Sequence, residues 1–127
     1  MILIYPAVIH EDADGLWIEF PDLTGCQSQG DTLEEILANA AEALECYALG
    51  IMESGGKLPA PSQPSRIKTE ENSFTTLVKA DIDLAKNTRS VKKTLTIPAW
   101  LNDRAVANGI NFSSVLQKAL LSQLNIV

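Results

Sequence analysis

Apolar residues that recur at steps of three and four between positions 33 and 51 constrain the fold of this chain more than any other feature. Thr32 and Glu35 have the spacing of a capping box before this stretch, and Gly55 and Gly56 end it. The sequence therefore predicts one long helix with an acidic solvent face and a single apolar side. That side consists of Leu33, Ile36, Leu37, Ala40, Leu44, Tyr47, Ala48 and Ile51.

Four short stretches have strand character, and a sheet formed from them would cover the apolar side of this helix. Residues 2–9, 16–20 and 25–29 precede it, and residues 74–80 follow it after a proline-containing stretch. Residues 12–15, Asp-Ala-Asp-Gly, have the chemistry of a tight turn. We expect an α+β fold in which the elements follow the order β-β-β-α-β.

The last forty residues show a second pattern, of strand, helix and helix. Residues 91–98 alternate polar and apolar side chains, residues 99–108 have helical spacing, and Gly109 follows as a C-cap. Asn111 is a good N-cap for a second helix, with an apolar stripe of Phe112, Val115, Leu116, Ala119, Leu120 and Leu124. So small a unit cannot bury these residues alone. We therefore expect a homodimer through residues 90–127, in which two strands pair antiparallel.

The strand of such a dimer has an apolar face, Leu95 and Ile97, and a polar face. A two-stranded ribbon fits the major groove of B-DNA, and the free N–H groups at a helix start bind phosphate. The candidate DNA-binding residues are therefore Lys92, Lys93, Thr94 and Thr96 of the strand and Asn111, Ser113 and Ser114 of the second helix.

This pattern resembles the ribbon-helix-helix family over residues 90–125, except that a longer polar or basic side chain is common where Thr96 stands. A plain dimerisation module with solvated lysines is one alternative. A helix-turn-helix is another, but it gives the strand before Pro98 no role.

The two parts of the chain carry opposite charge. Residues 1–85 contain fifteen acids and four bases, a net charge of −11, whereas residues 86–127 contain six bases and one acid, a net charge of +5. The total of −6 hides this division. We interpret it as two modules with different partners, of which the basic one is the candidate for binding nucleic acid.

A series of motifs in the first 62 residues resembles the HicB antitoxin family. In order they are Tyr-Pro-Ala-Val (5–8), Phe-Pro-Asp-Leu-Thr-Gly-Cys (20–26), Gly-Asp-Thr-Leu-Glu-Glu (30–35), Asn-Ala-Ala-Glu-Ala-Leu (39–44) and Pro-Ala-Pro-Ser (59–62). The resemblance implies a partial ribonuclease-H-like, toxin-neutralising domain over residues 1–85. It is compatible with a ribbon-helix-helix DNA-binding domain over residues 86–127.

The same resemblance implies an antitoxin of a type II toxin–antitoxin system. Such a protein inhibits a small HicA-like ribonuclease that cleaves mRNA, and it represses its own operon by binding operator DNA. The candidate toxin-binding residues combine acids with an aromatic anchor: Glu11, Asp12, Asp14, Trp17, Glu19 and Asp22. A tetramer would follow if the N-terminal modules also pair. A solitary ribbon-helix-helix regulator without a toxin partner is the alternative function.

A metal-dependent nuclease is a further alternative, because a ribonuclease-H-like fold can carry carboxylates that converge on paired Mg²⁺ ions. The acids of this chain fall in a turn, a strand and loops, with no sequence reason to meet. His10 has no Ser, Cys or metal-ligand cluster beside it in the sequence. We therefore expect no enzyme and no metal or other cofactor.

The remaining features favour a cytoplasmic protein that contacts no membrane. The apolar residues 1–9 are too short for a membrane span and lack the basic flank of a signal peptide. Cys26 and Cys46 are too few for a disulfide framework. We interpret both as reduced thiols, and Cys26 as a small buried side chain.

Overall fold

The computed structural model describes residues 1–83 and 90–125, and it divides the chain into two compact units, residues 1–89 and 90–127. The boundary expected between residues 85 and 86 lies outside the described residues. Each unit is therefore taken by itself below.

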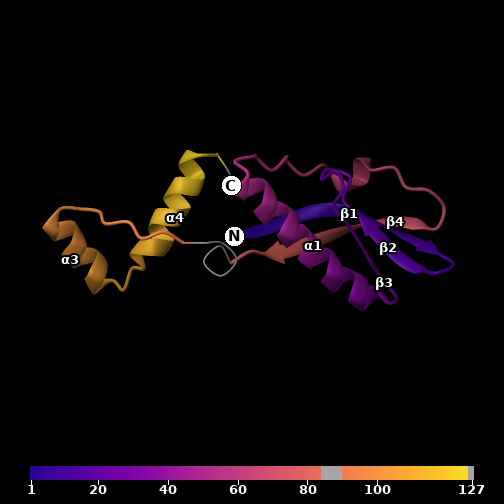
Figure 1. The fold of residues 1–127 in the computed structure, drawn as a ribbon, viewed down its shortest axis with the longest axis horizontal. Coiled ribbons are helices and arrows are strands. Elements are labelled where there is room, and N and C mark those ends of the chain that lie inside the picture. Colours follow the sequence, from indigo (N-terminus) through magenta and orange to yellow (C-terminus); the bar gives the residue numbers. More distant parts are fainter. Residues whose placement is uncertain (84–89, 126–127) are drawn as a thin grey trace. The chain divides into compact units, whose positions relative to one another are not determined.

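The first unit is built on an antiparallel sheet with the strand order β3-β2-β1-β4 (Figure 1). The strands are β1 (Ile2–Asp12), β2 (Gly15–Glu19), β3 (Gln27–Gly30) and β4 (Ser73–Asp81). Helix α1 (Leu33–Glu53) lies between β3 and β4 in the chain. The predicted α+β fold and the predicted order β-β-β-α-β are confirmed.

Helix α1 begins as the sequence predicts, because Thr32 Oγ1 accepts a hydrogen bond of 3.1 Å from the Glu35 N–H. Its fully buried side chains are Ile36, Ala40, Leu44 and Ala48. These residues stand four apart and form one ridge, which is the line along which a helix contacts a sheet. The predicted apolar side is therefore too wide: Leu33 is 54% exposed and Leu37 40% exposed.

The core of this unit lies between α1 and the sheet. Besides the ridge of α1, it contains alternate residues of the strands, which point to one face of the sheet: Tyr5, Ala7, Ile9, Ile18, Val78 and Ala80. Phe20, directly after β2, joins them. Leu23 and Cys26 close it from the loop between β2 and β3. The burial expected for Cys26 is confirmed, with 4% of the residue exposed.

Glycine allows the end of the sheet to approach the start of α1 closely. A β-carbon on Gly30 would lie 2.9 Å from the backbone nitrogen of Ile36, so no larger residue fits without displacing backbone. Gly15 has a φ of +138° in the predicted turn between β1 and β2, where Asp12 Oδ1 accepts from the Asp14 N–H at 2.9 Å. The two glycines bring the β1–β2 turn, the end of β3 and the start of α1 together.

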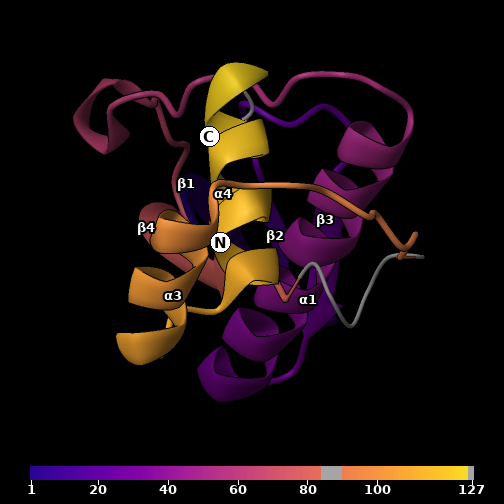
Figure 2. The ribbon, with the colours of Figure 1, turned by 90° about the vertical axis from the view of Figure 1, so that its left-hand side faces the viewer.

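The second unit contains helices α3 (Ala99–Ala107) and α4 (Phe112–Gln123) (Figure 2). Gly109 between them has a φ of +66°, and Asn111 Oδ1 accepts from the Ser114 N–H at 3.1 Å. Both predicted caps are therefore confirmed. None of the described residues of this unit is buried.

The strand expected at residues 91–98 is not formed in this single chain, which has no regular secondary structure there. A strand is held by hydrogen bonds to a neighbouring strand. The pairing expected for residues 91–98 was with a second copy of the chain, so an isolated chain cannot show it.

Candidate functional site

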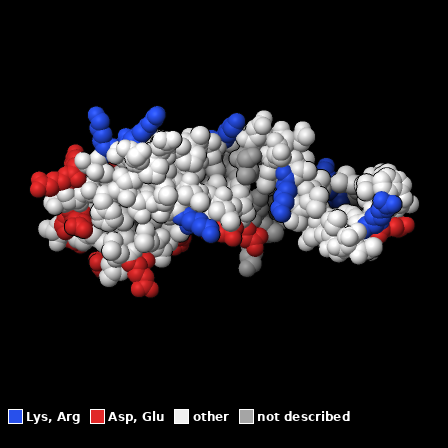
Figure 3. Space-filling model, turned by 180° about the vertical axis from the view of Figure 1, so that it is seen from behind, with Lys and Arg blue, Asp and Glu red and all other residues white. Residues whose placement is uncertain are grey.

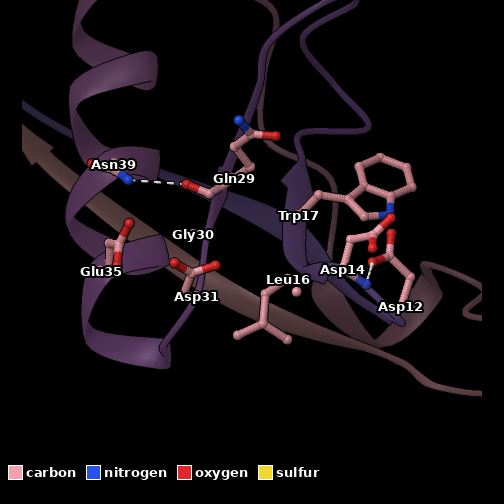
Figure 4. Close-up of a pocket in the computed structure, with 10 residues that line it drawn as sticks. Asp12, Asp14, Leu16, Trp17, Gln29, Gly30, Asp31, Glu35 and Asn39 are labelled. Carbon is pink, nitrogen blue, oxygen red and sulfur yellow. Dashed lines mark hydrogen bonds between the residues drawn. The ribbon is translucent and has the colours of Figure 1, made fainter.

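A hollow of about 510 Å³ opens where the β1–β2 turn meets the junction of β3 and α1 (Figure 4). Four of its ten lining residues are acidic, with Asp12 and Asp14 on the turn and Asp31 and Glu35 at the start of the helix (Figure 4). None of these ten residues is Lys or Arg. The other lining residues are Gly15, Leu16, Trp17, Gln29, Gly30 and Asn39. We call this the acidic hollow.

A side-chain hydrogen bond holds the β3–α1 side of the acidic hollow in place. Asn39 Nδ2 donates a hydrogen bond of 2.9 Å to the carbonyl oxygen of Gln29, which ties β3 to α1. Asp31 and Glu35 flank the cap at Thr32, where the positive end of the helix dipole favours carboxylates. The hollow therefore presents four exposed carboxylates from two separate segments, a field that attracts cationic side chains.

Trp17 also lines a second hollow, of about 600 Å³. This second hollow is lined by Val8, His10, Glu19 and Pro21 on the sheet side and by Ile67, Lys68, Thr69 and Glu70 of the segment before β4. Trp17 is half-buried, so part of a large aromatic ring remains available to a partner.

His10 has neighbours that the sequence does not reveal. Its ring stacks on Trp17 with the centroids 4.0 Å apart, its Nδ1 lies 2.7 Å from Ser73 Oγ, and its Nε2 lies 3.6 Å from Glu19 Oε1. The sequence shows no serine beside His10, but the fold brings one there. Ser73 is 63 residues further along the chain and reaches His10 only because β4 pairs with β1.

The predicted toxin-binding residues fall into three groups. Asp12, Asp14 and Trp17 line the acidic hollow, and Glu19 lines the second hollow. Glu11 is exposed but lines neither. Sequence reasoning left out Asp31 and Glu35, because both were explained as helix-terminal charges.

Asp22 has a structural role. Its two carboxylate oxygens accept hydrogen bonds from the Ser62 N–H at 2.8 Å and from the Ser62 hydroxyl. The neighbouring Tyr5 hydroxyl donates to the carbonyl oxygen of Pro59. Burial, and then the negative charge of Asp22, raises the pKa of Tyr5. These contacts fasten the segment after α1 to the loop after β2.

The predicted DNA-binding residues are accessible in the second unit. Lys92, Lys93, Thr94, Thr96 and Ser113 are exposed, and Asn111 caps α4. The Ser114 N–H donates to the Asn111 side chain and is therefore engaged within the chain. The N–H groups of Phe112 and Ser113 are not engaged by this cap.

Two kinds of feature are absent from the described residues, a metal-ligand cluster and a membrane-spanning helix. Within residues 1–83 and 90–125, no three His, Cys, Asp or Glu side chains are grouped so that they could hold a metal ion. Among the helices in that part of the chain, none has the length and apolar character needed to cross a membrane.

The fold is one shared with antitoxins of bacterial toxin–antitoxin systems. The family model described as "HicB_like antitoxin of bacterial toxin-antitoxin system" matches residues 5–119, so the chain belongs to the HicB-like antitoxin family. It is accordingly a regulatory protein and not an enzyme.

Individual relatives agree with this assignment. An uncharacterised 14.9 kDa protein from the rep-hol intergenic region of Haemophilus phage HP1 is 34% identical over 105 residues, which are 80% of this chain and 78% of the phage protein. A toxin–antitoxin complex from Streptococcus pneumoniae contains a chain that is 29% identical, with a TM-score of 0.59 over 97% of this chain and 99% of that one.

A chain of the HicA3 and HicB3 toxin–antitoxin complex is 31% identical, with a TM-score of 0.55. That match covers 63% of this chain and 100% of the other. The chain in a crystal structure of the antitoxin HicB3 is 30% identical in sequence to this one, with a TM-score of 0.54 over 95% of this chain and 97% of that one.

Proposed function

We propose that this protein binds and inhibits a small, basic, HicA-like ribonuclease toxin through the acidic hollow, and represses its own operon by binding operator DNA through a dimer of the second unit. The observation that carries the first part is that Asp12, Asp14, Asp31 and Glu35 line one hollow together with Trp17.

Charge supports the toxin-binding role. A protein that binds RNA needs basic side chains for the phosphates, and those side chains also fit a surface of carboxylates. Figure 3 shows Asp and Glu side chains at the left-hand end and along the lower edge of the first unit, and Lys and Arg side chains along its upper edge. Complementary charge speeds association, and a half-buried tryptophan offers an anchor of the kind that dominates interface energies.

The exposed apolar surface of the second unit supports the dimer. Eleven large apolar side chains within residues 90–125 are at least 42% exposed, among them Leu95, Trp100, Phe112 and Leu120. Soluble monomers rarely expose so much apolar surface in so short a chain. A second copy covers this surface if residues 91–98 pair across the two-fold axis, and that pairing also supplies the strand that the single chain lacks.

The ribbon formed in this way carries the DNA-binding role. Its polar face holds Lys92, Thr94 and Thr96 from each copy, in a region with a net charge of +5. Base contacts come from this ribbon, and phosphate contacts come from Lys93 and the start of α4 near Asn111 and Ser113. The first unit is negatively charged, like DNA, so it repels DNA from the acidic hollow.

The test uses the full chain, the small basic protein encoded beside its gene, and DNA from upstream of that gene pair. We expect the chain to form a complex with the basic protein, to stop its cleavage of RNA, and to bind the DNA with an affinity that falls steeply as salt rises. Absence of complex formation, with DNA binding intact, would instead support the solitary regulator. Absence of both would contradict the proposal.

A further inference from the structure

His10 lies where three strands of the sheet meet. It pairs in register with Trp17 of β2 and with Ser73 of β4. Side chains directly opposite in antiparallel strands share one face of the sheet and interact. The imidazole is accordingly held between the indole of Trp17, 4.0 Å away and inclined by 17°, and the hydroxyl of Ser73.

The two ring nitrogens of His10 have different surroundings. Nδ1 is hydrogen-bonded to Ser73 Oγ at 2.7 Å. Nε2 is shielded from solvent and finds no hydrogen-bond partner in the described part of the chain. The carboxylate of Glu19 stands 3.6 Å from it, beyond hydrogen-bond distance.

Protonation of His10 adds an N–H donor and a positive charge to the imidazole ring. A neutral imidazole donates from one nitrogen only, whereas the protonated ring donates from both. In the tautomer whose Nδ1–H donates to Ser73 Oγ, protonation adds Nε2–H, which lies 3.6 Å from Glu19 Oε1. In the other tautomer Nε2–H is already present, and protonation adds a positive charge beside the same carboxylate. The Glu19 side chain is 39% exposed, so it has room to move the short distance that completes the ion pair.

Other charged groups near the ring are further away or exposed. Lys68 and Glu70 line the same hollow from the segment before β4, are exposed and carry opposite charges. Ser73 of β4 is uncharged, and Glu11 and Asp12 follow His10 on its own strand. Within residues 1–83, Glu19 is the carboxylate at ion-pair distance from His10.

We propose that His10 is a pH-responsive positioning residue for the surface that receives the toxin. Neutral His10 leaves the charge of Glu19 free for a basic partner, and protonated His10 pairs with Glu19 and cancels that charge. The stacked ring supports Trp17, which lines both hollows. This inference rests on the proposed function, since it assumes that the toxin docks around Trp17, and it makes toxin binding weaker in acid.

The first test needs no toxin. In a Trp100→Phe variant of the full chain, Trp17 is the remaining tryptophan. A protonated imidazole stacked on an indole changes the fluorescence of the indole. We expect a fluorescence step when the pH is lowered from about 8 to about 5, and its loss on adding His10→Gln. A step that survives in the His10→Gln variant, or no step at all, overturns the proposal.

The second test compares toxin affinity at about pH 8 and about pH 5.5. The acid-induced loss of affinity should be about three- to fivefold larger for the wild-type chain than for His10→Gln. Glu19→Gln should reduce the acid-induced loss of affinity by the same factor as His10→Gln. The variant that carries both substitutions should show the same pH ratio of affinities as either single variant. Glu70→Gln is the matched control and should keep the wild-type pH ratio.

The outcomes separate the two proposals. If the wild-type chain binds no toxin at any pH, the proposed function fails, and the fluorescence test still decides whether His10 responds to pH beside Trp17. If the toxin binds tightly but all variants show the same pH ratio, toxin binding stands and the role of His10 is wrong. Circular dichroism of each variant shows whether it folds, and Glu19→Gln tests the pair without altering the ring.

Discussion

Asp22 accepts hydrogen bonds from both the backbone N–H and the hydroxyl of Ser62, forty residues further along the chain. The pair closes the segment after α1 onto the loop between β2 and β3. Because both carboxylate oxygens have partners within the fold, Asp22 is better placed to stabilise the first unit than to receive a partner protein.

Replacing Asp22 should therefore affect stability more than toxin binding. We expect Asp22→Ala to lower the free energy of unfolding by about 1 kcal/mol, because two charge-assisted hydrogen bonds at a half-exposed site are lost. Ser62→Ala, which keeps the backbone N–H, should cost less. Urea denaturation followed by circular dichroism measures both. Unchanged stability with weakened toxin binding would instead support the predicted toxin contact at Asp22.

Two glycines should respond to alanine in opposite directions. A β-carbon at Gly30 would meet the backbone of Ile36 at 2.9 Å, so Gly30→Ala should destabilise the first unit by about 1–3 kcal/mol. Gly50 lies inside α1 with nothing within 4 Å of its added β-carbon, so Gly50→Ala should stabilise it by about 0.5–1 kcal/mol. Thermal unfolding of the two variants provides the comparison. An equal change in melting temperature for both would contradict the close approach of β3 and α1.

The two thiols should differ sharply in reactivity. Burial, and after it the neighbouring thiol of Cys46, raises the pKa of Cys26 to about 11, whereas Cys46 is exposed. Since the thiolate is the reactive form, iodoacetamide at about pH 8 should modify Cys46 alone in the native protein and both residues after denaturation. Peptide mass spectrometry identifies the site. Modification of Cys26 in the native protein would show that the loop after β2 opens.

Association and DNA binding of the second unit should be separable. Leu95→Asp should give a monomer by light scattering, because it places a charge on the expected dimer face, and operator binding should then be lost. Lys92→Ala should leave the dimer intact and weaken operator binding about three- to tenfold. It should also lower the steepness with which the logarithm of the affinity falls with the logarithm of the salt concentration by about one. Lys57→Ala, an exposed lysine of the first unit, is the control. Normal operator binding by Lys92→Ala would contradict the proposed ribbon.

Local chemistry made much of the first unit predictable from sequence. Thr32 and Glu35 specify the start of α1, and residues 12–15 specify a turn, because the groups that form these contacts lie within four positions of one another. The same holds for Gly109 and Asn111, which mark the end of α3 and the start of α4. Period-two and period-four patterns then indicate which faces enter the core.

The contacts that could not be predicted from sequence join residues that are far apart in the chain. His10 meets Ser73, and Asp22 meets Ser62, through strand pairing and chain packing that no local pattern encodes. Asp31 and Glu35 join Asp12 and Asp14 in the acidic hollow only once Gly30 brings β3 against α1. The strand expected at residues 91–98 depends on a second molecule.

The most direct measurement of the central claim is the affinity of the toxin for two variants with the same loss of charge. Asp14→Asn with Asp31→Asn removes two carboxylates from the acidic hollow, whereas Glu42→Gln with Glu53→Gln removes two from elsewhere on α1. Titration calorimetry should show affinity weakened on the order of tenfold or more for the first variant and about twofold or less for the second. Equal weakening of both would mean that the toxin responds to overall charge, which would contradict recognition at the acidic hollow.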